Sequence, residues 1–199
     1  MKINMKNRLL LKIGTLILGL MLLFTMSCDE DVPPIEDEEE IITDVILTFT
    51  SNGNSITASA QDPDGEGPMS IAVSGPVLLS ANTTYQLSIK MENSVAGESI
   101  TEEVEEEADE HMLFFGFTNG LFSNPMGDGN IDQREDAVNY LDEDASGLPL
   151  GLLTSWTTGE VGEGTFRIVL KHQPDLKTAE STVNVGSSDI DLTWNVVIE

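Results

Sequence analysis

The sequence predicts an all-β protein, an antiparallel β-sandwich of immunoglobulin-like type with one short acidic helix. Several segments of the 199-residue chain alternate apolar and polar residues with a period of two, which is the pattern of a strand with one buried face. Turns rich in glycine and asparagine separate them, so that seven or eight short strands are expected after Ile41. A closed barrel is the alternative that the same pattern allows.

The first predicted strands form a hairpin over 45–60, because apolar residues alternate on both sides of Asn52-Gly53, a pair that favours a tight turn. The other clear alternations lie at 85–91, 166–170 and 190–198, and the weaker strand candidates at 69–73, 112–117, 137–141 and 152–157. Trp194 lies on the apolar side of the last clear alternation, so we expect it in the core.

One segment between the strands has helical spacing. Ser99 and Glu102 are placed as a capping box, and apolar residues recur every four positions from Ile100 to Ala108. Most of the residues around them are acidic. We therefore expect a short acidic helix over Ser99–Glu110.

The N-terminus resembles a bacterial lipoprotein signal. Basic residues up to Lys12 precede an apolar stretch over 13–24, and a small residue, Ser27, precedes Cys28. The stretch is about 12 residues long, whereas a membrane-spanning helix needs about 20. Cys28 is the only cysteine, so it forms no internal disulfide and is free to carry lipid. We expect a signal peptide over 1–27 and a lipid anchor on Cys28; an ordinary signal peptide or an uncleaved anchor is the alternative.

The chain is strongly acidic. Its net charge is −26, and loss of residues 1–27 removes four of nine basic residues and no acidic one, leaving −30. This charge repels nucleic acid and anionic headgroups, so no nucleic-acid partner is expected. Residues 28–40 have the composition of an acidic tether before a single ligand-binding domain over 41–199. The tether resembles the acidic export tag of lipoproteins shown on the outer face of the outer membrane; a plain spacer is the alternative.

The two histidines lie at the ends of predicted elements, beside carboxylates. His111 closes the acidic helix, and Glu107 is four residues earlier on the same helical face. His172 ends a predicted strand, and the proline that follows lets Asp175 fold back toward it. If the two ends meet, these four residues form a site suited to zinc or copper. The alternative is two surface histidines, with His111 as a helix cap.

Three acidic loops suggest calcium instead. The segment from Asn124 resembles a twelve-residue calcium loop, although Met126 stands where an oxygen ligand is needed. The candidate calcium ligands are Asp128, Asn130, Asp132, Glu135, Asp62, Asp64, Asp142 and Asp144. Solvated turns rich in Asp, Asn and Gly are the alternative.

Two runs, 103–111 (EVEEEADEH) and 171–175 (KHQPD), together with the loop at 142–151, resemble a group of small uncharacterised bacterial surface lipoproteins. The likeness covers the chain from about residue 38 to the C-terminus. Such chains are sometimes labelled as having a type 1 periplasmic binding fold, but that fold needs alternating β and α units and a longer chain. The resemblance implies a lipoprotein that works with an outer-membrane uptake receptor, and it implies no particular activity.

The sequence contains no Gly-x-Ser-x-Gly, no glycine-rich phosphate loop and no HExxH, so we expect a protein without enzymatic activity. The prediction is a lipid-anchored, surface-exposed protein of the outer membrane that binds a ligand, with a divalent metal ion as the leading candidate. The alternative is a structural or adhesive β-sandwich whose loops are stabilised by calcium.

Overall fold

The computed structural model describes residues 40–65, 70–132 and 138–199, and Glu39–Glu199 forms one compact unit. The predicted signal peptide, Cys28 and the tether up to residue 39 lie outside the described residues. Within the described residues, no helix has the length and apolar character needed to cross a bilayer.

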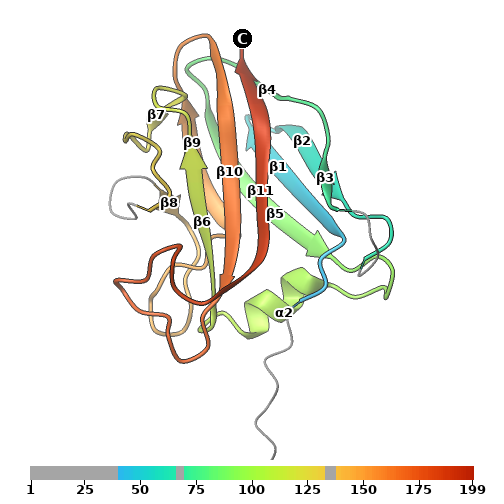
Figure 1. Ribbon diagram of the computed structural model, residues 1–199. Helices are drawn as coiled ribbons and strands as arrows, with labels where there is room; N and C mark the ends of the chain where they lie inside the picture. Colours follow the sequence, from blue (N-terminus) through green and yellow to red (C-terminus); the bar gives the residue numbers. More distant parts are fainter. Residues whose placement is uncertain (1–39, 66–69, 133–137) are drawn as a thin grey trace, which may run out of the picture. The chain divides into compact units, whose positions relative to one another are not determined.

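The compact unit contains two β-sheets and one short helix (Figure 1). The prediction of an all-β sandwich is confirmed. The two sheets are separate, so the closed-barrel alternative is wrong. The finer immunoglobulin-like assignment stays a prediction.

The larger sheet has the strand order β3-β2-β1-β5-β9-β7, and β8 also pairs with β9. Its strands are β1 (Asp44–Ser51), β2 (Asn54–Gln61), β3 (Ala72–Val73), β5 (Thr84–Glu92), β7 (Phe122–Asn124), β8 (Asn139–Tyr140) and β9 (Leu153–Thr158). The predicted hairpin is β1–β2. Asn52 and Gly53 both have the positive φ that a two-residue hairpin turn requires.

The smaller sheet has the order β4-β11-β10-β6. Its strands are β4 (Val77–Leu79), β6 (His111–Phe117), β10 (Gly162–His172) and β11 (Ser187–Ile198). β4 runs parallel to β11, and the other pairs are antiparallel. The sequence did not predict β4 and β7, because three residues are too few to establish a period of two.

Helix α2 (Ile100–Glu106) lies across the lower end of the sandwich in Figure 1, between β5 and β6 in the chain. It begins as predicted, since the Ser99 side chain accepts a hydrogen bond from the Glu102 amide. The prediction that it continues to Glu110 is wrong. After Glu106 the amides of Glu110 and His111 both donate to the Glu107 carbonyl, which turns the chain into β6.

The core between the sheets is rich in aromatic side chains. Phe166 of β10 is fully buried, and its ring lies 5.1 Å from that of Trp156, 5.9 Å from Phe115 and 6.1 Å from Phe49, measured between centroids. Trp194 is also fully buried, as predicted. Phe166 thus connects side chains of both sheets.

Replacing Phe166 with alanine should therefore lower the free energy of unfolding by about 3–5 kcal/mol, because a large cavity would open among rings that cannot all move inward. Urea denaturation measures the change. Val161→Ala is the control: this side chain is 73% exposed, and we expect a change within about 0.5 kcal/mol. Equal losses in the two variants would contradict this description of the core.

Candidate metal centre

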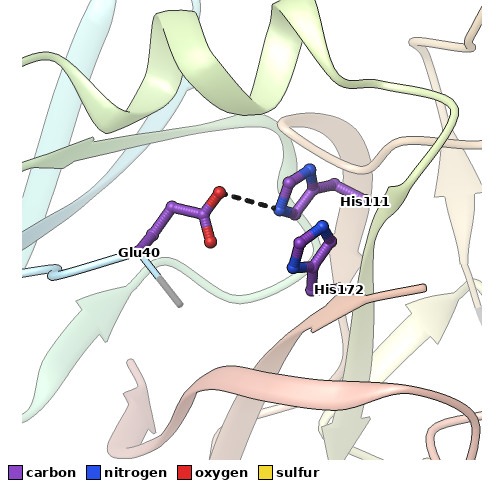
Figure 2. A group of neighbouring side chains, drawn as sticks. All are labelled: Glu40, His111 and His172. Atoms are coloured by element: carbon purple, nitrogen blue, oxygen red, sulfur yellow. Dashed lines mark ion pairs between the residues drawn. The ribbon is translucent and has the colours of Figure 1, made fainter. Parts of the chain in front are cut away.

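The two histidines face each other across a strand pair. β6 and β10 are antiparallel, with His111 directly opposite His172 and Leu113 opposite Leu170. Residues two apart on a strand share a face, so both imidazoles point to the inner side of the sheet, as the two core leucines do. Their rings are stacked, with centroids 4.5 Å apart and planes at 6° (Figure 2). The imidazole pair is the last layer of the core at the end covered by α2.

His111 is fully buried, and its two ring nitrogens have different surroundings. Nδ1 lies 3.2 Å from the carbonyl oxygen of Glu107, which can only accept, so Nδ1 carries a hydrogen. Nε2 lies 3.3 Å from Oε1 of Glu40, the contact drawn as a dashed line in Figure 2. On the same side, Oδ2 of Asp189 lies 3.9 Å from Nε2. Two carboxylates therefore face one buried imidazole nitrogen.

Glu40 and His111 change each other's protonation. Burial raises the pKa of Glu40, but the hydrogen bond and charge of His111 outweigh it, so the pKa lies below its usual value. Burial lowers the pKa of His111, but the facing Glu40, the Glu107 carbonyl and Asp189 outweigh it, so this pKa is raised. Both shifts favour a positive charge on His111 beside a carboxylate.

Asp189 reaches this position through a β-bulge. The register between β10 and β11 shifts at Leu170/Lys171: Leu170 opposes Ile190, whereas Lys171 opposes Ser188. Asp189 is the extra residue between those two pairs, and its side chain is fully buried. A bulge changes the direction of the side chains that follow it along a strand, and here it accompanies a carboxylate turned toward His111.

Two groups of side chains within the described residues have the spacing of metal ligands. Ligand atoms of Glu40, His111 and His172 lie within 4.8 Å of one another, and so do those of Glu107, Glu110 and His172. We call the first the inner group and the second the outer group. The inner group is almost completely buried, whereas the side chains of Glu107 and Glu110 are 54% and 39% exposed. In the outer group, His172 Nε2 lies 3.3 Å from Oε2 of Glu110.

The structure brings together three of the four residues predicted for a zinc or copper site, namely Glu107, His111 and His172. Asp175 belongs to neither group and is exposed. The turn after His172 explains its position, because the amides of Leu176 and Lys177 both donate to the Gln173 carbonyl and Asp175 has a φ of 57°. Three further residues of this neighbourhood were not predicted from the sequence, namely Glu40, Glu110 and Asp189.

Most of the candidate calcium ligands within the described residues accept hydrogen bonds from backbone amides. Single carboxylate or amide oxygens of Asp62, Asp128 and Asn130 each accept from the amide two residues later, as in ordinary Asx turns. The two oxygens of Asp142 accept from the amides of Gly151 and Leu153. Neither metal-ligand group includes a candidate calcium ligand. Glu135 lies outside the described residues, and the calcium assignment stays a prediction.

Gly129, the glycine of the calcium-loop resemblance, has a role in packing. Its φ is 73°, and a Cβ at this position would lie 1.8 Å from the carbonyl oxygen of Phe117. The Phe117 amide in turn donates to the Gly129 carbonyl. A glycine is required here because the loop lies directly against β6.

Asp144 takes part in a buried ion pair beside the histidines. Its Oδ2 lies 2.9 Å from Nζ of Lys177, and both side chains are 1% exposed. Lys177 Nζ also donates to the carbonyl of Ala108, just before β6. The segment after His172 is thereby tied to the turn that leads into His111.

No family model matches the chain, and no curated protein or solved structure is significantly similar to it. The resemblance to small surface lipoproteins therefore stays a prediction, and only the geometry of the centre indicates a function.

The Asp144–Lys177 pair gives a pH-dependent prediction. Asp144→Asn should lower the free energy of unfolding by about 3 kcal/mol at neutral pH, because the Lys177 ammonium would stay buried without its counter-charge. Burial raises the pKa of Asp144, but Lys177 and the amides of Leu148 and Ser146 lower it more, to below the usual 3.8. The contribution of the carboxylate is therefore complete above pH 3.8 and is lost as the pH falls through the lowered pKa.

Urea denaturation of both proteins between pH 3 and pH 7 tests this prediction. The difference between them should be constant above about pH 4 and shrink at more acidic pH. Asp175→Asn, at an exposed position, serves as the control and should change stability by less than about 0.5 kcal/mol. A difference that persists undiminished to pH 3 would contradict the assignment to Asp144.

Proposed function

We propose that this protein binds one divalent transition-metal ion, zinc or copper, between Glu40, His111 and His172. In this proposal it acts without enzymatic activity, as a lipid-anchored protein of the cell surface. The observation that carries the proposal is the surroundings of His111 Nε2, a buried nitrogen that faces carboxylates in place of a hydrogen-bond donor.

The hydrogen on Nδ1 leaves the neutral ring of His111 with a lone pair on Nε2. That lone pair faces Oε1 of Glu40 at 3.3 Å, and Oε2 of Glu40 is buried with no hydrogen-bond partner among the described residues. Two acceptors that face each other away from water are strongly unfavourable. A cation must therefore lie between them, and it is either a proton on His111 or a metal ion.

The spacing is consistent with a metal ion. Two ligand atoms that each lie about 2.0–2.1 Å from a tetrahedral zinc ion are about 3.3 Å apart, which is the separation of His111 Nε2 and Glu40 Oε1. A ligand histidine commonly donates its other ring N–H to a backbone carbonyl, which fixes its orientation, and Glu107 provides that carbonyl. Two imidazoles with one carboxylate suit zinc or copper, whereas calcium prefers oxygen ligands throughout.

The predicted location fits this role. The lipid anchor on Cys28 and display on the outer membrane are predictions from the sequence, and the proposed metal site does not depend on them. Without residues 1–27 the net charge is −30, and such a protein attracts cations from its surroundings. The proposal therefore joins capture of a metal ion to retention at the cell surface.

Isothermal titration of the full chain, purified in detergent and stripped of metal, tests the proposal. Zinc or copper should bind with one-to-one stoichiometry. Glu40→Gln keeps the size of the side chain but removes its charge. It should weaken metal binding by about 100-fold or more, because loss of a residue that only hydrogen-bonds to a metal ligand already costs 10–100-fold in affinity.

Glu102→Gln is the matched control, because it makes the same change at an exposed position of α2 outside both groups. Its affinity should equal that of the wild type within about twofold. Absence of zinc and copper binding in the wild type would refute the proposal and identify the centre as a buried ion pair. Calcium binding that only raises the melting temperature would favour the structural module.

A further inference from the structure

We propose that the outer group, Glu107, Glu110 and His172, is the entry subsite through which a metal ion reaches the inner group. This inference rests on the metal-binding function proposed above. It gives the carboxylates of Glu107 and Glu110, which are not in the inner group, a role in the binding of the incoming ion.

The two groups differ in their access to solvent. Side chains of the inner group are at most 7% exposed, so a hydrated ion in solution does not meet them directly. Glu107 and Glu110 are exposed enough to bind an ion that keeps part of its water shell. His172 belongs to both groups. An ion held by the outer group is therefore already beside a residue of the inner group.

The contacts around His111 also indicate that an ion would pass from the outer group to the inner group. Oε2 of Glu107 lies 4.0 Å from Nδ1 of His111, on the opposite side of the ring from Glu40 and Asp189. The Glu107 backbone fixes the ring that serves the inner group, while its side chain belongs to the outer group. Transfer from the outer to the inner group exchanges exposed carboxylates for His111 and Glu40 around the shared residue His172.

The local charge favours this route. The outer group follows the last turn of α2, and α2 carries Glu102, Glu103, Glu105 and Glu106 without a basic residue in its last turn. The C-terminal end of a helix carries partial negative charge, and a run of carboxylates raises the local concentration of cations. These effects increase the rate at which ions arrive without requiring that they stay.

The experiment measures rates as well as affinity. Association of zinc with the metal-free full chain is followed by stopped-flow fluorescence, and dissociation by transfer to an excess of chelator. An entry subsite speeds loading and release equally. Glutamine keeps an oxygen that can accept a hydrogen bond from His172, so Glu107→Gln/Glu110→Gln should lower both rate constants by about tenfold and change the equilibrium affinity much less.

Glu102→Gln/Glu105→Gln is the matched control, because it removes the same charge from exposed positions of the neighbouring helix α2, outside the outer group. Equal slowing in the two double variants would overturn the proposal and assign the effect to long-range attraction. Faster dissociation with unchanged association would also overturn it, because Glu110 would then only orient His172. Failure of the wild type to bind zinc refutes the metal-binding function, whereas tight wild-type binding with unaltered rates in the first variant refutes the entry subsite alone.

Discussion

The antiparallel register of β6 against β10 is the constraint on which both the core and the candidate metal centre depend. It places Phe117 opposite Phe166 and Leu113 opposite Leu170 in the core, and His111 opposite His172 at the end of the same face. A slip of one residue would turn every side chain of one strand to the other face and separate the imidazoles. Because the apolar pairs would be lost in the same slip, burial of the core fixes the geometry of the histidines.

This register puts a titratable ring where water does not reach, and the neighbouring elements then determine its chemistry. The turn after α2 holds Nδ1 through the Glu107 carbonyl, and two carboxylates remain on the Nε2 side. A proton satisfies that arrangement as an ion pair, and a metal ion satisfies it as a ligand set. In the proposed function, a metal ion would therefore displace a proton from His111, as is general for imidazole ligands. Without a metal ion, the raised pKa of His111 favours a proton in this place.

Much of the fold could be predicted because its strands are long enough to show their period. β1, β2, β5, β10 and β11 each have at least eight residues, and their buried positions largely alternate. β4 and β7 have three residues each and were missed. The end of α2 was placed too late, because acidic residues continue to Glu110 with no local signal for a stop. There, pairing of His111 with β10 overrides helical propensity.

The site was predictable only where neighbours in the sequence are also neighbours in space. Glu107 and His111 are four residues apart, and both strand ends were visible, so the meeting of the histidines could be anticipated. Asp175 was predicted to be a metal ligand because it follows His172 closely in the sequence, but the turn after His172 directs it to solvent. Glu40 lies 71 positions before His111, at the end of a segment with the composition of a tether. The position of Asp189 beside His111 depends on a β-bulge, which the spacing of residues in the sequence does not reveal. Both carboxylates reach Nε2 through long-range packing, and their burial beside it is what turns two paired histidines into a centre that requires a cation.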